Sequence, residues 1–123
     1  MKTQQPSIEQ ILELMKQQMG EAPETLVQLS EINPDFVVHH AMSKQFAMQE
    51  GNIPPKYKIL IGLGAAAALG VPACINAYVK EALKAGISPE ELVETLVLTR
   101  FVKGTSVIST AAEAIKMISE AQR

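Results

Sequence analysis

The segment Ala82–Leu92 reads ALKAGISPEEL, and the order of its residue types marks the end of one helix and the start of another. Gly86 is the residue type that most often follows a helix C-terminus. Two residues later, Ser88 can accept a backbone N–H as an N-cap, and Pro89 suits the first helical position. Glu91 is spaced to reach back to the cap. The segment therefore predicts one helix that ends at Gly86 and a second that begins at Ser88.

The same signals mark helices on both sides of this segment. Ser7 and Gln10 have the spacing of a capping box, and Asn33 followed by Pro34 is a typical helix start. The predicted helices cover 8–19, about 23–30, 34–50, 55–69, 72–86, 88–103 and 105–121. No stretch alternates between apolar and polar residues as a half-buried strand does. We therefore predict an all-α fold, a single-domain helical bundle of about six to seven helices.

The composition is that of a globular protein of one domain. The chain has 123 residues, of which 47% are apolar and 20% charged, enough to bury a core without disulfides. The net charge is −2, basic residues are scattered and aromatic residues are few, so we expect no nucleic-acid partner. A single cysteine suits the reducing cytosol, and Met1–Pro6 lacks the apolar core of a signal peptide. These features predict a cytoplasmic protein.

An uncharged stretch, Ile59–Ile75, is almost long enough to suggest a membrane span. Gly70 and Pro72 interrupt it, however, and many of its residues are alanine or glycine, so we expect two packed helices and no membrane partner. Small residues also let helix backbones approach closely. Because a helix that is apolar on every side must be covered on every side, the stretch predicts self-association into a homo-oligomer.

Cys74 is the first candidate for chemistry because of its place in a predicted helix. Pro72 at the first helical position puts Cys74 in the first turn, where free N–H groups and the helix dipole favour a thiolate. Tyr78 lies one turn later on the same face and can donate a hydrogen bond to the sulfur. One interpretation is an activated catalytic thiol. The other is a buried, inert cysteine, since free cysteine is among the most buried residue types.

His39 and His40 are the other candidate catalytic residues, and both lie in the third predicted helix. Adjacent helical residues point about 100° apart, so the two imidazoles cannot face the same metal ion or substrate. Either one can serve as a general base if it lies in a cleft. The alternative is one histidine at the edge of the core and one at the surface.

Other chemistries find little support in the sequence. No Glu-x-x-His or His-x-x-x-His pair is present, so we expect no metal site, and Glu9 and Glu13 fit a solvated helix face. The glycines of 62–67 superficially match a dinucleotide-binding fingerprint, but the run lies within a helix, and we expect no cofactor. Arg100 stands in an apolar stretch and fits either a bidentate carboxylate contact or a helix C-terminus.

A family resemblance emerges from the order of these features. A proline-rich lead-in precedes Lys56–Ile61 (KYKILI), and a small-residue helix, a break and Cys74 follow. The segment ALKAGISPEEL and a last helix after Gly104 complete the order. The chain resembles the carboxymuconolactone decarboxylase family, which includes alkylhydroperoxidase D, over about 33–118, with 1–32 as additional N-terminal helices. The resemblance implies an alkylhydroperoxidase D-like helical fold that assembles as dimers, trimers or hexamers.

The redox branch of this family has a C-x-x-C-x-x-x-H motif and an upstream glutamate. In this sequence Cys74 matches the second cysteine, whereas Val71 stands at the first, Tyr78 at the histidine and Ile59 at the glutamate. A cycle between two cysteines of one chain is therefore not available, and an oxidised Cys74 needs an external thiol.

Three hypotheses follow for the function, each with a small molecule or a partner as ligand. The resemblance favours a thiol-dependent, peroxiredoxin-type peroxidase with an antioxidant role, in which Cys74 is oxidised and an external thiol reduces it. The second is a decarboxylase or lyase that acts on a small lactone bearing a carboxylate, with His39, His40, Tyr78 or Arg100 as binding or acid–base groups. The third is a non-catalytic helical oligomer.

Overall fold

A computed structural model describes residues 5–123, apart from the side chain of Met19. The first four residues of the segment considered for a signal peptide lie outside this range. Within it the chain folds into seven helices and no strand, so the predicted all-α fold is confirmed. The helices are α1 (Ile8–Met19), α2 (Glu24–Ile32), α3 (Pro34–Met48), α4 (Pro55–Leu69), α5 (Pro72–Lys84), α6 (Pro89–Thr110) and α7 (Ala112–Ala121).

The predicted caps form at three helix starts. At α1 the Gln10 backbone N–H donates to Ser7 Oγ at 3.2 Å, and the Ser7 N–H donates to Gln10 Oε1 at 2.9 Å. Asn33 caps α3 through its side-chain oxygen. At α6 the Glu91 N–H donates to Ser88 Oγ at 3.1 Å, while the Glu91 carboxylate accepts from the Ser88 hydroxyl at 3.2 Å. Each bond satisfies a backbone donor or a polar side chain at a helix start.

One predicted boundary is wrong. The sequence predicts a break after Lys103–Gly104, but α6 continues to Thr110, and the change of direction occurs at Ala111. Gly104 does not adopt the left-handed backbone that ends a helix, in contrast to Gly70 and Gly86. A glycine inside a helix costs about 1 kcal/mol relative to alanine, which a helix of 22 residues can absorb.

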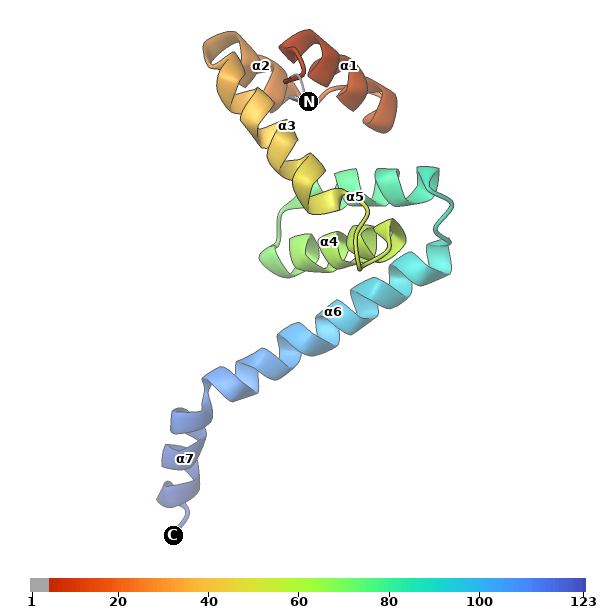
Figure 1. Ribbon diagram of the computed structural model, residues 1–123. Helices are drawn as coiled ribbons and strands as arrows, with labels where there is room; N and C mark the ends of the chain where they lie inside the picture. Colours follow the sequence, from red (N-terminus) through yellow and green to blue (C-terminus); the bar gives the residue numbers. More distant parts are fainter. Residues whose placement is uncertain (1–4) are drawn as a thin grey trace.

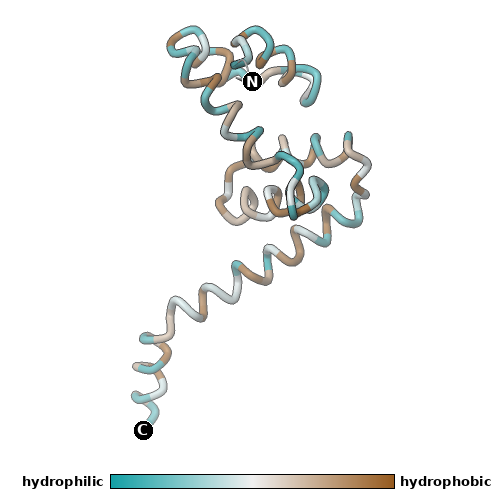
Figure 2. The backbone as a smooth tube through the Cα atoms, in the orientation of Figure 1, coloured by the Kyte–Doolittle hydropathy of each residue, from teal (hydrophilic) through white to brown (hydrophobic). Residues whose placement is uncertain are grey.

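The helices form a body with a projecting arm (Figure 1). Helices α4 and α5 lie antiparallel at the centre, α1–α3 pack together beyond one side of them, and the first half of α6 crosses α4. The second half of α6, about 15 Å at 1.5 Å per residue, leads away from the body and ends in α7 (Figure 1). Apolar and polar segments alternate along the whole arm in Figure 2. The arm thus carries apolar surface without support from the rest of the chain.

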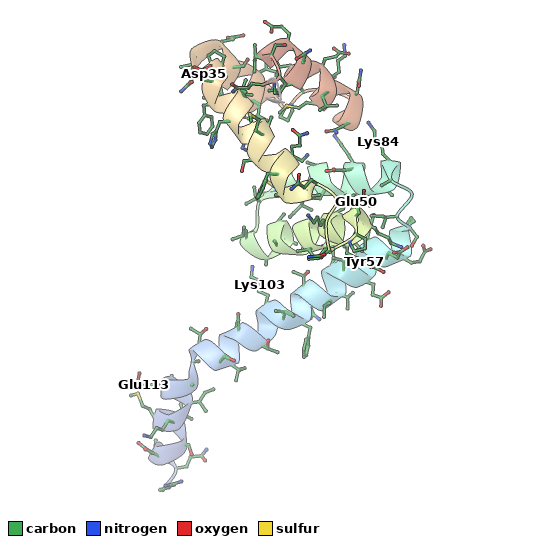
Figure 3. All side chains as sticks on the ribbon, viewed as in Figure 1. Asp35, Glu50, Tyr57, Lys84, Lys103 and Glu113 are labelled. Carbon is green, nitrogen blue, oxygen red and sulfur yellow. The ribbon has the colours of Figure 1, made fainter. Side chains whose placement is uncertain are left out.

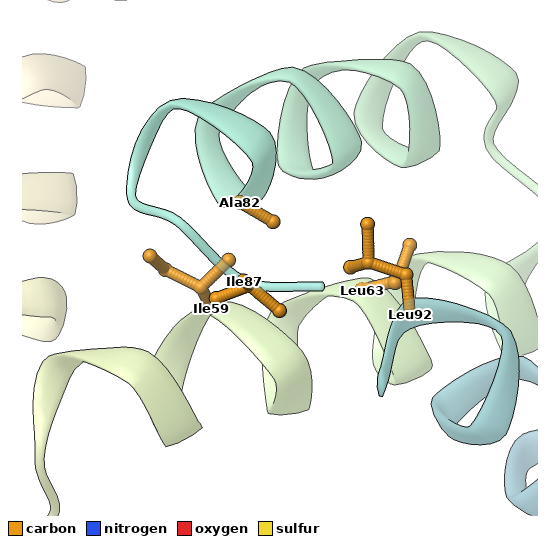
Figure 4. Close-up of a cluster of buried hydrophobic side chains, with 5 residues drawn as sticks. All are labelled: Ile59, Leu63, Ala82, Ile87 and Leu92. Carbon is orange, nitrogen blue, oxygen red and sulfur yellow. The ribbon is translucent and has the colours of Figure 1, made fainter. Parts of the chain in front are cut away.

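The main core lies where α4, α5 and the start of α6 meet (Figure 4). Its buried residues are Ile59, Leu63, Ala82, Ile87 and Leu92. A second, smaller cluster joins α1 to α3 through Ile11, Val37 and Val38.

Polar contacts connect α3 to the central helices. The Lys58 ammonium of α4 donates to the carbonyls of Ala47 and Gln49 at 2.9 and 2.7 Å, which satisfies acceptors at the end of α3. Lys44 of α3 pairs with Glu81 of α5 at 3.5 Å.

The small residues of α4 allow neighbouring helices to pack closely, as the sequence predicts. A Cβ added to Gly64 would lie 3.0 Å from Thr99 Oγ1 of α6. A Cβ added to Gly62 would lie 2.5 Å from Tyr78 Cε1 of α5. The glycines that superficially match a dinucleotide fingerprint therefore serve helix packing on two sides of α4.

An ion pair fixes the start of α6 against α4. Lys56 Nζ lies 2.7 Å from Glu91 Oε2. The hydrogen bond from Lys56 holds the pKa of the Glu91 carboxyl below its usual value, and the same bond raises the pKa of Lys56. Because of this pair, the stability of the fold depends on pH in acid, where Glu91 titrates, and in alkali, where Lys56 titrates.

We expect Glu91→Gln to remove the acid limb of this pH dependence. Because the folded pKa of Glu91 lies below its usual value of 4.5, the carboxylate adds stability above that value and loses it as pH falls through the folded pKa. The Lys56 contribution is complete below 10.5 and is lost as pH rises through its raised pKa. In urea unfolding, the free energy of unfolding of wild type should be higher than that of Glu91→Gln at neutral pH. The two values should be equal in strong acid. An equal difference at both pH values would contradict this assignment.

Much apolar surface remains exposed. Nine apolar residues are buried in the described part of the chain, whereas twenty-two large apolar side chains are exposed. The surface area is 9545 Å², while a compact monomer of 13.3 kDa is expected to expose about 6,500 Å². On α4, Ile61 and Leu69 are exposed although Leu63 is fully buried. Within residues 5–123, each helix is too short or too polar to cross a membrane.

Candidate functional site

The turn between α4 and α5 places Cys74. Gly70 adopts a left-handed conformation (φ 73°) that ends α4, and its N–H donates to the carbonyls of Ala66 and Ala67. Val71 is extended and Pro72 begins α5, so Cys74 occupies the first turn of the helix, as predicted. The thiol is exposed in this chain. The alternative of a buried cysteine is therefore wrong for the single chain, and the sulfur is open to reagents.

Tyr78 lies one turn after Cys74, with its ring against α4. The ring fills the space that a side chain at Gly62 would occupy. Burial raises the pKa of the Tyr78 hydroxyl above its usual value, and the negative charges of Glu81 and Cys74 raise it further. Tyr78 is therefore protonated at neutral pH. It lies close enough to Cys74 for a negative charge on the sulfur to raise the pKa of its hydroxyl. Among the hydrogen bonds of residues 5–123, however, none joins the Tyr78 hydroxyl to the sulfur.

We expect Gly62→Val to displace Tyr78 and lower the free energy of unfolding by about 1–3 kcal/mol. The added side chain would overlap the Tyr78 ring, whose Cζ atom lies 2.6 Å from the position of the new Cβ. Gly51→Val is the control, because a Cβ at Gly51 meets no atom within 4 Å. Thermal or urea unfolding measures both. Equal free energies of unfolding for the two variants would show that the packing of the Tyr78 ring does not require a glycine at position 62.

The two histidines lie on α3, and both side chains are exposed. The alternative of one histidine at the edge of the core is therefore wrong for this chain. Within residues 5–123, no hydrogen bond or ion pair connects His39 or His40 to Cys74 or Tyr78. The structure thus brings Cys74 and Tyr78 together on α5 and leaves the histidines on a separate helix.

A groove with two cations lies between α4 and α6. It has a volume of about 340 Å³ and is lined by Ala67, Leu96, Thr99, Arg100, Lys103, Gly104 and Val107. Figure 3 shows Lys103 on the part of α6 that faces the end of α4. No carboxylate of the described residues lies within ion-pair distance of Arg100 or Lys103. The groove therefore combines an apolar floor with positive charge.

Arg100 lies ten residues before the end of α6, so its interpretation as a helix-end arginine is wrong. Lys103 was not predicted as a companion of Arg100. Their spacing of three residues puts both on one side of a helix, beside Leu96 and Val107, and this signal was available in the sequence. The error followed from the misplaced helix break after Lys103.

Metal ligands do not gather in the structure. Within residues 5–123, no group of three or more histidine, cysteine, aspartate or glutamate residues could hold a metal ion. Cys74 and the two histidines stand apart, and most carboxylates lie on exposed helix faces.

Comparisons with known proteins agree with the fold. The model of the carboxymuconolactone decarboxylase family matches residues 37–117, which include Cys74, Tyr78 and both histidines. A solved structure from Burkholderia xenovorans LB400, assigned as a carboxymuconolactone decarboxylase, is similar over 94% of this chain and 96% of its own. The TM-score is 0.67 and the sequence identity is 26%. No curated protein matches the chain.

Proposed function

Because the chain belongs to the carboxymuconolactone decarboxylase family, we propose that it reduces hydroperoxides through the thiol of Cys74. The observation that carries this proposal is the exposed sulfur in the first turn of α5. Free N–H groups and the positive end of the helix dipole lie at this helix start, an environment typical of reactive cysteines. Cys74 thus has the two features of a reactive cysteine, a position at a helix start and exposure to solvent.

The first step of the proposed reaction transfers one oxygen atom. The Cys74 thiolate attacks the outer oxygen of the hydroperoxide, the O–O bond breaks, and the alcohol leaves after it takes up a proton. Cys74 becomes a sulfenic acid and has lost two electrons to the peroxide. Tyr78, which is held protonated, supplies a hydrogen-bond donor one turn away from the reacting sulfur.

An external thiol completes the cycle, since Cys74 is the single cysteine of the chain. A first thiolate attacks the sulfenic sulfur, water leaves, and a mixed disulfide forms. A second thiolate attacks the external sulfur of this disulfide and releases Cys74. The two external thiols give up two electrons as they form the disulfide, which balances the reduction of the peroxide. Exposure of Cys74 favours this exchange, because the first external thiol must reach the Cys74 sulfur directly.

The substrate class follows from the surroundings of the sulfur. The turn that precedes α5 exposes the apolar side chains of Leu69 and Val71. Apolar contacts favour an organic hydroperoxide over hydrogen peroxide, because the organic group gains from burial of its own surface.

Turnover of an organic hydroperoxide with a small dithiol as reductant tests the proposal. We expect wild type to consume peroxide faster than an equal concentration of free cysteine, with the alcohol as product. Loss of the activity after alkylation of Cys74 would attribute it to this thiol. A rate no greater than that of free cysteine, for both organic hydroperoxide and hydrogen peroxide, would refute the proposal.

The groove between α4 and α6 favours a second candidate function, a lyase that acts on a lactone bearing a carboxylate. Arg100 presents a planar pair of donors that suits a carboxylate, and Lys103 adds a second positive charge. Ala67, Leu96 and Val107 supply apolar surface for the rest of a small ligand. The matched family is named for decarboxylation of such a compound.

For this second function we expect Arg100→Gln to weaken binding of a small lactone carboxylate about tenfold or more, with a further loss in Arg100→Gln/Lys103→Gln. Calorimetry or a fluorescence titration can measure the dissociation constants. Lys116→Gln on α7 is the control, because it removes an exposed cation outside the groove. If all three variants bind like wild type, the groove does not hold the carboxylate.

A further inference from the structure

The groove between α4 and α6 lies at the same end of the body as Cys74. Figure 1 shows that α4 ends where α5 begins, and that the middle of α6 passes beneath the end of α4. The groove is bounded by Ala67 near the end of α4 and by Arg100 and Lys103 of α6. Cys74 occupies the first turn of α5, directly after the turn that follows α4. The cations of the groove and the sulfur thus lie at one end of α4.

Chain geometry limits the distance between the groove and the sulfur. The chain is helical from Ala67 to the end of α4, Val71 is extended, and α5 begins at Pro72. With about 5 Å for each helical piece and about 7 Å for the extended links, the Cα atoms of Ala67 and Cys74 are at most about 20 Å apart. An extended hydrocarbon chain advances about 1.3 Å per carbon atom, because a C–C bond is about 1.5 Å long. A chain of about 12 to 16 carbon atoms therefore spans this distance.

The path between the groove and Cys74 is apolar. Leu96 and Val107 contribute apolar side chains to the lining of the groove. On the turn that leads to α5, the side chains of Leu69 and Val71 are exposed. A hydrocarbon chain along this path would remove apolar surface from water on both molecules, at about 25 cal/mol per Å². The path therefore favours a ligand with a long apolar chain.

The polar side chains of the groove suit a single carboxylate at one end of such a ligand. Arg100 presents a planar pair of N–H donors that matches the two oxygens of a carboxylate, and Lys103 adds a second positive charge. Among the described residues, no carboxylate forms an ion pair with either cation. Apart from Thr99, whose hydroxyl donates to the Thr95 carbonyl at 2.8 Å, the rest of the lining is apolar. A phosphate ester of a sugar would leave this lining uncovered, whereas an acid with a hydrocarbon chain covers it.

We infer that the hydroperoxide reduced by Cys74 is that of an amphipathic carboxylic acid, such as a long-chain fatty acid. This inference rests on the proposed peroxidase function and specifies its substrate class. Arg100 and Lys103 hold the carboxylate, the hydrocarbon follows the apolar path, and the peroxide group on the chain lies at the sulfur. The thiolate then takes the outer oxygen, the O–O bond breaks, and the hydroxy acid leaves after its alkoxide takes up a proton.

The effect of the groove on the reaction follows from its distance to the sulfur. The carboxylate lies far from the O–O bond, so its contacts with Arg100 and Lys103 are the same in the bound substrate and in the transition state. Contacts of this kind lower KM and leave kcat unchanged. Hydrogen peroxide lacks both the carboxylate and the chain, so it gains nothing from the groove.

Protection of Cys74 by an unreactive acid tests the inference without any turnover. Dodecanoate has a carboxylate and a chain long enough to approach the sulfur, whereas butyrate has the carboxylate and a chain that is too short. We expect dodecanoate, below its micelle concentration, to slow the alkylation of Cys74 by iodoacetamide about fivefold or more. Butyrate should leave the alkylation rate unchanged. Arg100→Gln/Lys103→Gln should lose most of the protection by dodecanoate.

Lys116→Gln/Arg123→Gln is the matched control for the loss of charge, because it removes two positive charges from exposed positions outside the groove. This variant should keep the protection seen in wild type, and circular dichroism checks that both double variants keep their helices. Equal protection in wild type and in Arg100→Gln/Lys103→Gln would refute the inference. Absence of protection by dodecanoate, or equal protection by butyrate, would also refute it.

Turnover then tests the substrate class. A fatty-acid hydroperoxide is compared with its methyl ester, which keeps the chain and the peroxide group but lacks the charge. For wild type we expect kcat/KM to be about tenfold or more higher for the acid, at similar kcat, and Arg100→Gln/Lys103→Gln to abolish this preference. Equal kcat/KM values for acid and ester in wild type would overturn the inference even though peroxide is consumed. If no hydroperoxide is consumed, the proposed function fails and the substrate class with it, while the alkylation rates still decide whether the groove binds the acid.

Discussion

Replacing Cys74 with serine is expected to reduce the rate of hydroperoxide turnover by about a hundredfold or more. Serine keeps the size of the side chain, but its hydroxyl does not ionise at neutral pH and cannot accept the peroxide oxygen as the sulfur of a cysteine does. The residual rate should equal that of the reductant alone. The measurement is the initial rate of organic hydroperoxide loss at fixed dithiol, with the helical content of the variant checked by circular dichroism.

A relocated thiol provides the control for this prediction. Ser109→Cys in the Cys74→Ser background introduces a thiol at an exposed position near the C-terminal end of α6, where the helix dipole disfavours a thiolate. We expect no recovery of the rate. If the relocated thiol restores turnover, or if Cys74→Ser alone retains it, the first turn of α5 has no special role.

Replacing Leu63 with alanine is expected to lower the free energy of unfolding by about 3–5 kcal/mol. Leu63 is fully buried at the centre of the cluster that joins α4, α5 and α6. Loss of its side chain removes apolar contacts and leaves a cavity among neighbours that helix packing holds in place. Because small domains are stable by only about 5–15 kcal/mol, the variant should be close to unfolding at physiological temperature.

Leu69→Ala provides the control on the same helix, because Leu69 is 79% exposed. We expect its unfolding free energy to change by about 0.5 kcal/mol or less. Both variants must be compared with wild type at one protein concentration, because association would add to the apparent stability. If Leu69→Ala lowered the free energy of unfolding as much as Leu63→Ala, the buried cluster would not be the centre of the fold.

The fold could be predicted from the sequence wherever local chemistry decides the structure. The capped start at Ser7, the Asn33–Pro34 start and the Ser88–Pro89 start each depend on residues within one helical turn, and all three form. The end of α6 could not be predicted in this way. Glycine favours a helix end but is tolerated inside a long helix, so the structure at Gly104 depends on the helix as a whole.

The candidate site was predictable only in part, for a related reason. The position of Cys74 follows from Pro72 and the helix start, so the sequence places it correctly. The distance of His39 and His40 from Cys74 depends on how α3 packs against α4 and α5, which no local signal reports. The groove at Arg100 also depends on the approach of α4 to α6, although the spacing of Arg100 and Lys103 on one side of a helix is visible in the sequence.

The most direct test of the proposed peroxidase function is to capture the oxidised state of Cys74. Reduced protein is treated with one equivalent of an organic hydroperoxide in the presence of a 1,3-dicarbonyl reagent that traps sulfenic acids, and the peptide that contains Cys74 is analysed by mass spectrometry. We expect one trapped adduct per chain at Cys74, with one equivalent of alcohol released. An unmodified Cys74 thiol, with the hydroperoxide still present, would contradict it.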